Sequence, residues 1–223
     1  MTTPTDQHST SERFSDVIRT ATFSDHETAA MSGFMTALFE ERLPVEAYTS
    51  MVAQHHFAYV VLEQAGDALA AHPVAGPFVV EALRRGPALE ADLTHLLGPD
   101  WRDEIRPSVA TTAYADRMTA VCFDQPEAFV AHHHTRYMGD LSGGQMIGRI
   151  ARRAYELEPG AGAAFYEFPE IEDLTEFKDE YRVKLDRAAW SDDERERLLA
   201  EVVRMYHEAC VALGIEPRAA AEH

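Results

Sequence analysis

The chain has 223 residues, of which 46% are apolar, so it is long enough for one domain with its own hydrophobic core. Its 38 acidic and 20 basic side chains give a formal net charge of −18, which argues against binding to nucleic acid or to an anionic membrane surface. Any anionic ligand would have to find a local group of basic side chains.

Polar residues interrupt every apolar run, so no stretch approaches the roughly 18 residues that a membrane-spanning helix needs. Residues 1–12 are polar and lack the apolar segment of a signal peptide, and we expect them to form a disordered leader. A cytoplasmic location is therefore the expectation. Cys122 and Cys210 each lie in an apolar segment, which predicts two buried small side chains and no catalytic thiol.

Apolar residues recur every three or four positions along most of the chain, and the alternation typical of strands is nearly absent. This pattern predicts an all-α fold, a single-domain bundle of about seven to nine helices. In chain order, helices are expected over residues 11–31, 34–42, 44–71, 78–85, 88–97, 108–123, 124–157, 170–187 and 191–214. We expect the helical domain to span residues 13–214, and residues 215–223 to form a flexible tail.

Several of these boundaries rest on local signals. Pro44 and Pro126 suit the first turn of a helix, and the pair Pro159 and Gly160 is typical of a helix end. Ser191 and Glu194 have the spacing of a capping box, in which each side chain accepts a hydrogen bond from the backbone of the other.

The segment 131–150, AHHHTRYMGDLSGGQMIGRI, is unusual because it places four glycines inside a predicted helix, most of them on one face: Gly139, Gly143, Gly144 and Gly148. Each interior glycine costs about 0.5–1 kcal/mol relative to alanine, so something must compensate. One explanation is the close packing of two helices. A second is a phosphate-binding loop, although the preceding strand and the Gly-Lys-Ser/Thr signature are missing.

A third explanation is a flat ligand that lies directly on the backbone of a kinked helix. Asp140 and Arg136 lie beside the glycines and favour a polar, water-holding cavity there over a dry helix crossing.

The run TRYMGDLSGGQ at residues 135–145 resembles the signature of the heme oxygenases, with Met138 where leucine is usual. HETA from His26 with the following GFM, YVVLE at 59–63 and FKDEYR at 177–182 resemble further segments of the family, in the family's order. The resemblance covers residues 14–214. It implies a helical bundle that holds heme b, which is both substrate and cofactor, between a proximal and a kinked distal helix.

The resemblance assigns residues on both sides of the heme. His26 matches the axial ligand of the heme iron, where a neutral imidazole is expected. Gly139 and Gly143 match the distal glycines, whose backbone approaches bound dioxygen, and Gly144 is expected to contact heme beside them.

Asp140 matches the distal aspartate of the family, which holds a chain of hydrogen-bonded water molecules and does not touch the oxygen itself. The resemblance implies that Tyr59, Arg136 and Thr135 belong to the same network.

The two propionates of heme need cationic partners, and the resemblance implies Arg19, Lys178 and Arg182 for this role. The spacing of Lys178 and Arg182, one helical turn apart, is by itself equally typical of ordinary surface residues that pair with acidic neighbours. His134 replaces a tyrosine that commonly helps to bind a propionate. Because all three cations are retained, we expect attack at the α-meso edge.

Two further positions depart from the family. Ala30, four residues after His26, replaces a glutamate that can contact the other ring nitrogen of the axial histidine, so a water or a backbone carbonyl is left to take its place. Tyr206 stands where related sequences often have asparagine. The consecutive residues His132, His133 and His134 point about 100° apart on a helix, so no metal site is expected there.

The implied function is that of a bacterial-type, biliverdin-producing heme oxygenase, which uses dioxygen and reducing equivalents to cleave heme to biliverdin, ferrous iron and carbon monoxide. The α isomer of biliverdin is expected. The alternatives are a heme carrier or sensor without turnover, and a di-iron oxidase. The latter needs several Glu-x-x-His pairs, and the sequence offers only Asp92-x-x-His95.

The chain has no flavin or nicotinamide motif, so the electrons are expected to come from a separate ferredoxin or NAD(P)H-dependent reductase. A basic group on the extension of the distal helix is one candidate docking surface for an acidic donor: Arg149, Arg152 and Arg153. Neither nucleic acid nor a membrane is expected as a partner.

Overall fold

The computed structural model of the chain describes residues 13–212, and the side chains as far as Glu208. These residues form helices and connecting turns, with no strand among them, as the sequence predicts. The predicted leader (1–12) and tail (215–223) lie outside the described residues. In chain order the elements are α1 (Phe14–Ala30), α2 (Gly33–Phe39), α3 (Val45–Leu69), η1 (Gly76–Phe78), η2 (Glu81–Leu83), α4 (Gly86–Leu97), α5 (Trp101–Glu104), α6 (Val109–Val121), α7 (Pro126–Gly139), η3 (Asp140–Gly144), α8 (Gln145–Ala154), η4 (Ala164–Tyr166), α9 (Leu174–Arg187) and α10 (Asp192–Ala212).

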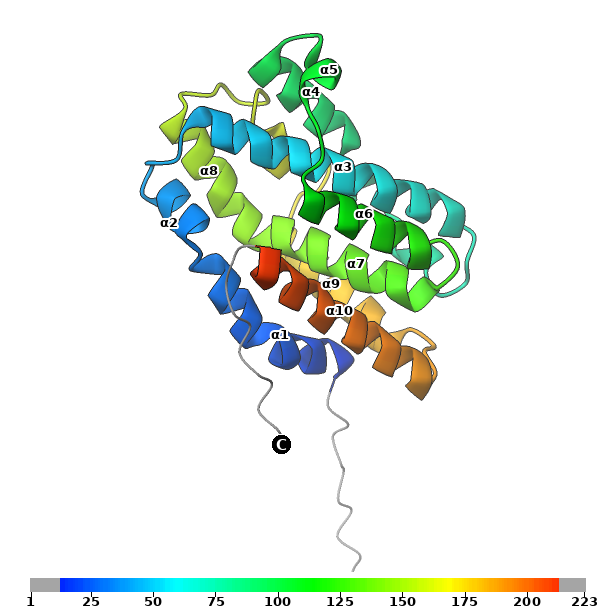
Figure 1. Cartoon of the computed structure of the whole chain (residues 1–223). Coiled ribbons are helices and arrows are strands. Elements are labelled where there is room, and N and C mark those ends of the chain that lie inside the picture. The colour runs from blue at the N-terminus through cyan, green and yellow to red at the C-terminus, as the bar shows by residue number, and fades with distance from the viewer. Residues whose placement is uncertain (1–12, 213–223) are drawn as a thin grey trace, which may run out of the picture.

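Helix α7 runs through the middle of the bundle (Figure 1). Helix α10 packs against α7 on one side and against α1 on the other, while α3 contacts α7, α4 and α6. The core takes fully buried aromatic and aliphatic side chains from α3 and its neighbours: Tyr48, Tyr59, Leu62, Phe78, Trp101, Phe129 and Phe165. Helix α7, which carries the glycine-rich segment, is therefore held by packing on two sides.

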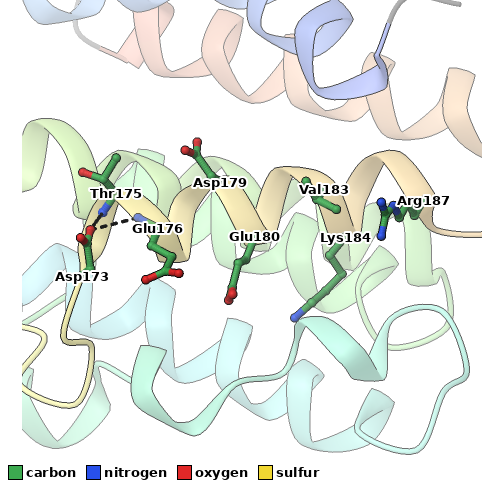
Figure 2. Close-up of a pocket in the computed structure, with 8 residues that line it drawn as sticks. All are labelled: Asp173, Thr175, Glu176, Asp179, Glu180, Val183, Lys184 and Arg187. Carbon is green, nitrogen blue, oxygen red and sulfur yellow. Dashed lines mark hydrogen bonds between the residues drawn. The ribbon is translucent and has the colours of Figure 1, made fainter.

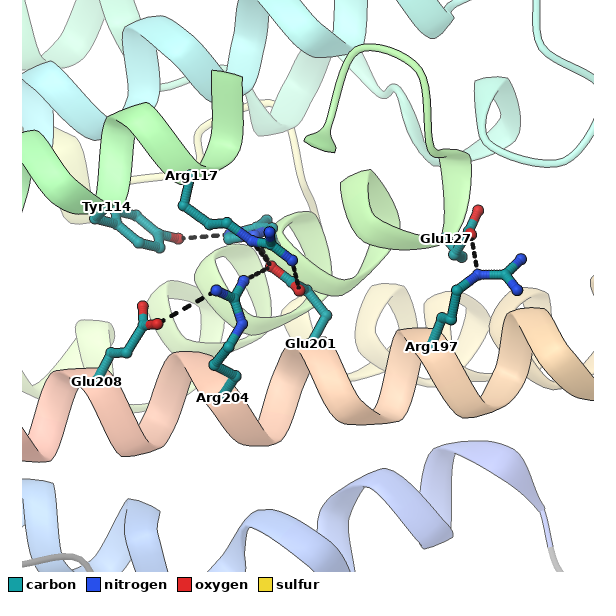
Figure 3. Close-up of polar contacts among 8 residues, drawn as sticks. Tyr114, Arg117, Glu127, Arg197, Glu201, Arg204 and Glu208 are labelled. Carbon is teal, nitrogen blue, oxygen red and sulfur yellow. Dashed lines mark hydrogen bonds and ion pairs between the residues drawn. The ribbon is translucent and has the colours of Figure 1, made fainter. Parts of the chain in front are cut away.

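Polar contacts also fix α10 against α6 and α7 (Figure 3). His132 is fully buried; its Nδ1 accepts from the hydroxyl of Tyr114 (3.1 Å), and its Nε2 donates to Glu201 (2.9 Å). Arg117 binds the second oxygen of Glu201 (2.8 Å), and Arg204 also pairs with this carboxylate. Burial alone would raise the pKa of Glu201, but hydrogen bonds from His132 and Arg117 hold this pKa well below its usual range. A charged acceptor with this many donors is satisfied inside the protein.

Several predicted helix boundaries are confirmed at the level of hydrogen bonds. Ser191 Oγ accepts from the backbone of Glu194 (3.3 Å) and Glu194 accepts from the backbone of Ser191 (2.7 Å), which completes the capping box. Ser108 caps α6 by accepting from the backbone of Thr111 (3.1 Å). The prediction for Cys122 is also confirmed, since its side chain is fully buried.

The predicted helix over residues 78–85 is wrong, because this segment forms only the two three-residue turns η1 and η2. Between them Val79 and Val80 are extended, as suits β-branched residues. Glu63 Oε1 accepts from the backbone N–H groups of Arg85 (2.5 Å) and Gly86 (3.1 Å), so this carboxylate takes the donors at the start of α4. Helices as short as eight residues are marginal on their own, so tertiary contacts decide the local structure of such a segment.

Several helix ends differ from the sequence prediction, three of them as follows. Helix α9 begins at Leu174 and not at residue 170, because Asp173 accepts from the backbone of Thr175 (2.7 Å) and Glu176 (3.0 Å) as its cap. Helix α8 ends at Ala154, before residue 157, and α2 ends at Phe39, before residue 42. The short α5 was not predicted. Within residues 13–212, no helix is both long and apolar enough to cross a bilayer.

Candidate active site

The predicted helix over residues 124–157 is interrupted by a π turn. Helix α7 ends at Gly139, the turn η3 occupies residues 140–144, and α8 continues from Gln145. A π turn inserts one extra residue into a helix and commonly kinks it, so this turn supplies a physical basis for the predicted kink. The Gln145 amide donates to the carbonyl oxygens of Asp140 (3.2 Å) and Tyr166 (2.8 Å), which secures the turn with a side chain.

The glycines of this segment point to two faces, and not mostly to one as the sequence spacing suggests. A Cβ added at Gly139 or Gly143 would meet no atom within 4 Å, so both residues border open space. A Cβ at Gly148 would lie 2.6 Å from the Cβ of Tyr166, and one at Gly144 would lie 3.3 Å from its ring. One pair therefore leaves a bare backbone surface, and the other allows close packing on η4. Gly144 is buried on that second face.

A partly buried polar cluster lies next to the open glycines. The hydroxyl of Tyr59, from α3, donates to the Asp140 carboxylate. The guanidinium of Arg136 lies over the Tyr59 ring at 5.1 Å, and its Nη2 donates to Nδ1 of His55 (2.6 Å). The structure thus brings together Tyr59, Arg136 and Asp140, three of the residues predicted for the distal network.

The environment of this cluster changes how its groups titrate. Burial raises the pKa of Asp140 to about 6, although Arg136 and the Tyr59 hydroxyl lower it. Burial and the neighbouring Asp140 raise the pKa of Tyr59 well above its usual value. Near neutral pH the site therefore contains a carboxylate acceptor and a phenol that keeps its proton.

His55 belongs to this cluster and was not predicted. Its ring stacks on Phe165 with centroids 5.0 Å apart, and burial together with Arg136 holds its pKa well below the usual value. The imidazole is therefore neutral and accepts from Arg136. His55 lies one helical turn before Tyr59, and this spacing is the sequence signal that would have identified it.

Thr135 is positioned differently from the other predicted members of the network. Its hydroxyl donates to the carbonyl oxygen of Ala131 (2.9 Å), one turn earlier in its own helix. A role for Thr135 in a water network stays a prediction.

His26 lies on α1 with an exposed side chain. Its ring meets the edge of the Tyr206 ring from α10, with centroids 6.1 Å apart and an angle of 67°. Tyr206, one of the departures from the family pattern, is thus a neighbour of the predicted iron ligand. The methyl group of Ala30 offers the imidazole no hydrogen bond.

The predicted propionate partners lie in different settings. Lys178 donates to the π turn, at the carbonyl oxygen of Leu141 (3.2 Å). Arg182 and Arg19 are exposed and pair with acidic residues of their own helices, Asp179 (2.6 Å) and Asp16 (3.1 Å).

His134 is a polar group with an unused atom. Its Nδ1 is buried without a hydrogen-bond partner among the described residues. Burial and the nearby Arg182 lower the pKa of this histidine to about 4. The adjacent His133 differs, because its Nδ1 lies 2.9 Å from the Tyr181 hydroxyl. Together with the contact of His132 with Glu201, this shows that the three consecutive histidines have three separate environments.

The basic group on α8 is only partly available for a partner. Arg152 pairs with Glu167 (2.5 Å), and Arg153 donates to Glu41 (2.7 Å). Arg149 is exposed, and no ion pair involves it within the described part of the chain.

Comparison with known proteins agrees with these observations. The sequence profile of the heme oxygenase family matches residues 12–207. The heme oxygenase of Pyropia yezoensis is 37% identical over 184 residues, which cover 82% of this chain and 77% of that protein. Heme oxygenase 1 of Nostoc is 34% identical over 191 residues, with coverages of 86% and 80%.

Solved structures show the same relationship. The crystal structure of heme oxygenase-1 from the cyanobacterium Synechocystis in complex with heme has a TM-score of 0.85 and 32% identity, and the match covers 91% of each chain. The heme oxygenase of Leptospira interrogans has a TM-score of 0.84 and 31% identity, with coverages of 91% and 98%. The predicted all-α fold and the predicted family are both confirmed: the chain belongs to the heme oxygenase family.

Proposed function

We propose that this heme oxygenase binds heme as its substrate between α1 and the bare glycine surface of α7 and η3, and cleaves it oxidatively to biliverdin. The observation that carries the proposal is the open space at Gly139 and Gly143 beside the partly buried Asp140 cluster. An interior helix position without a side chain costs stability, and a flat ligand on the backbone accounts for that cost. Membership of the family supports the reaction class.

Exposed apolar side chains near the proposed ligand residues fit a large, flat and mostly apolar ligand. Phe23, one turn before His26 on α1, is 57% exposed, and Met146, one turn after Gly143 on α8, is 43% exposed. Large apolar side chains left to solvent are typical of a ligand site. A tetrapyrrole would cover them.

The anionic edge of heme needs cations, and three basic side chains support it in this proposal: Arg19, Lys178 and Arg182. His134, whose lowered pKa keeps it neutral, would add a hydrogen bond and no charge. The ion pairs of Arg19 and Arg182 with Asp16 and Asp179 are exposed, so exchanging these partners for propionates costs little. Because propionate contacts set the rotation of heme about its normal, we propose the α isomer of biliverdin as the product.

Bound heme supplies the iron that binds dioxygen, and the protein supplies a ligand, a shape and protons. His26 would hold the iron through a neutral imidazole. Gly139 and Gly143 leave space that side chains would fill. Asp140, held by the Tyr59 hydroxyl, would accept hydrogen bonds from water and so control where a proton is available. His55 keeps Arg136 over the Tyr59 ring, away from a direct ion pair with the carboxylate.

The proposed function is tested by titration with hemin, followed by aerobic turnover with a reductant. An enzyme binds hemin at a ratio of one to one, loses the heme Soret band, gains a bilin band and releases a product that chromatography identifies as the α isomer. A carrier or sensor would keep a stable heme spectrum under the same conditions. That result, or the absence of stoichiometric binding, would contradict the proposal.

The pKa of Asp140 predicts how activity depends on pH. Turnover should decrease as the pH falls through about 6, because the carboxyl group then gains a proton and stops acting as a charged acceptor. The Asp140→Asn variant should turn over heme more slowly, and its rate should not decrease further as the pH falls through about 6. Asp92 provides the control: burial also raises its pKa to about 6, but it accepts from the backbone of Ala164 and Phe165. If the decrease of turnover at low pH disappeared in Asp92→Asn and persisted in Asp140→Asn, the pH dependence would not arise from Asp140.

We also propose that a separate ferredoxin or NAD(P)H-dependent reductase delivers electrons at the basic group Arg149, Arg152 and Arg153. Arg149 supports this most directly because it is exposed and makes no ion pair among residues 13–212. Arg149→Glu should lower the association rate of an acidic donor by about tenfold at low salt, with little effect at high salt, since surface charges act mainly on encounter. Arg187→Glu, on α9, is the matched control; an equal loss in both variants would indicate a nonspecific effect of charge.

A cytoplasmic location likewise stays a proposal.

A further inference from the structure

Helix α9 contacts both sides of the candidate site through two charged side chains. At one end, Lys178 Nζ donates to the carbonyl oxygen of Leu141 (3.2 Å) and to Ser142 Oγ (3.4 Å) in the π turn. Eight residues later, Asp186 accepts from the backbone N–H of Ser15 (2.8 Å) and from its hydroxyl (3.1 Å). Ser15 lies in the first turn of α1. One helix therefore connects the helix that carries His26 with the turn that shapes the glycine surface.

The contact with Ser15 replaces a missing helix cap. Arg13, the residue before α1, makes no side-chain cap, although the first N–H groups of a helix need acceptors. A carboxylate at this end accepts such hydrogen bonds and interacts favourably with the helix dipole. Asp186 supplies the carboxylate from a distant part of the sequence, so the cap also fixes α1 relative to α9.

The contact at the π turn leaves room for a ligand. An ammonium group has three N–H donors, of which Lys178 uses two on the turn, so one remains for a carboxylate. Lys178, Arg182 and Asp186 follow each other at four-residue spacing and share one face of α9. Arg182, a proposed propionate partner, thus lies between the two contacts.

We propose that α9 acts as a rigid spacer that sets the separation between α1 and the π turn, with Lys178 and Asp186 as its positioning residues. The two contacts are about 12 Å apart along the helix at 1.5 Å per residue. Over so short a length a helix is stiff, and a shift at one contact is transmitted to the other. The inference rests on the proposed function only for the identity of the ligand that would lie between α1 and the π turn.

Hydrogen–deuterium exchange of the protein without heme tests the spacer. In Lys178→Met and in Asp186→Ala, exchange should increase about three- to tenfold both at residues 15–18 and at residues 140–144, the change expected when one hydrogen bond to a charged group is lost from a local unit. Amides in α3 and α4 serve as the internal reference and should keep their rates. Increased exchange at both ends with an unchanged reference supports the spacer.

Two variants on another face of α9 are the matched controls. Glu180 and Lys184 line the groove shown in Figure 2, and Lys184 donates to the carbonyl oxygen of Pro77 (2.7 Å). Glu180→Ala and Lys184→Met should leave exchange at both ends unchanged. Asp186→Asn keeps an oxygen acceptor for the Ser15 N–H and should restore most of the protection.

If each variant increases exchange only at its own end, the two contacts are independent and the spacer is refuted. An increase throughout the chain, including α3 and α4, would refute it as well, since it indicates general destabilisation. With heme bound, Asp186→Ala should also release heme several times faster to an excess of apomyoglobin. A chain that bound no heme but showed the coupled exchange would contradict the proposed function while supporting the spacer.

Discussion

Replacing His26 with alanine is expected to lower turnover of heme by at least about two orders of magnitude. Loss of a group that merely orients a metal ligand costs 10- to 100-fold, and loss of the ligand itself should cost more. The side chain is exposed, and alanine is the best helix former, so the fold of α1 should not suffer. The variant should still bind heme, because the glycine surface and the cationic side chains remain. Steady-state bilin formation and the heme spectrum measure the two effects separately.

Imidazole added to His26→Ala should restore part of the activity, because it can occupy the space of the lost ring and bind the iron. His207→Ala is the control, since His207 is also an exposed histidine but lies on α10. Normal turnover of His26→Ala, or an equal loss in the control, would show that another group holds the iron.

Replacing Gly143 with alanine is expected to stabilise the free protein while damaging the enzyme. The added methyl group would meet no atom within 4 Å, and alanine is favoured over glycine inside a helix by about 0.5–1 kcal/mol. With heme bound, the methyl group would occupy the space of the ligand. Turnover should then fall about tenfold or more, because an extra methyl group in a packed site typically costs about 1–3 kcal/mol of free energy.

Gly148→Ala should show the opposite effect on stability. Its Cβ would lie 2.6 Å from the Cβ of Tyr166, which cannot move without its backbone, so the free energy of unfolding should fall by about 1–3 kcal/mol. Denaturant unfolding of the heme-free proteins compares the two variants directly. If Gly143→Ala were destabilised as much as Gly148→Ala, the glycine surface would not be open.

The glycines also show how far the sequence could predict this site. Four glycines inside a helical pattern left three explanations open, namely close helix packing, a phosphate-binding loop and a ligand surface on a kinked helix, because something must compensate for their cost. The pattern could not show that Gly144 and Gly148 pack on Tyr166, since the π turn changes the direction of each residue that follows it. A register shift of this kind leaves no signature in hydrophobic periodicity.

Contacts between distant segments were the other limit. The Tyr59, Arg136 and Asp140 cluster was predicted from a family resemblance, yet His55 was missed, although its place one turn before Tyr59 puts both residues on one face of the helix. The contacts of Tyr206 with His26 and of Asp186 with Ser15 join residues more than 150 positions apart. Helix caps such as Ser191 and Glu194 were predictable because both partners lie within one turn.

The π turn has a consequence for how this chain tolerates changes of length. Removing one residue of the turn, for example Ser142, would let a regular α-helix run through the segment, and the residues after it would keep nearly their present direction because the turn holds one extra residue. Gly148 would still face Tyr166, and Arg152 would still reach Glu167. A single codon deletion here should therefore preserve the packing of α8 and change only the turn, whereas the same deletion inside α8 would rotate every later residue of that helix by about 100°.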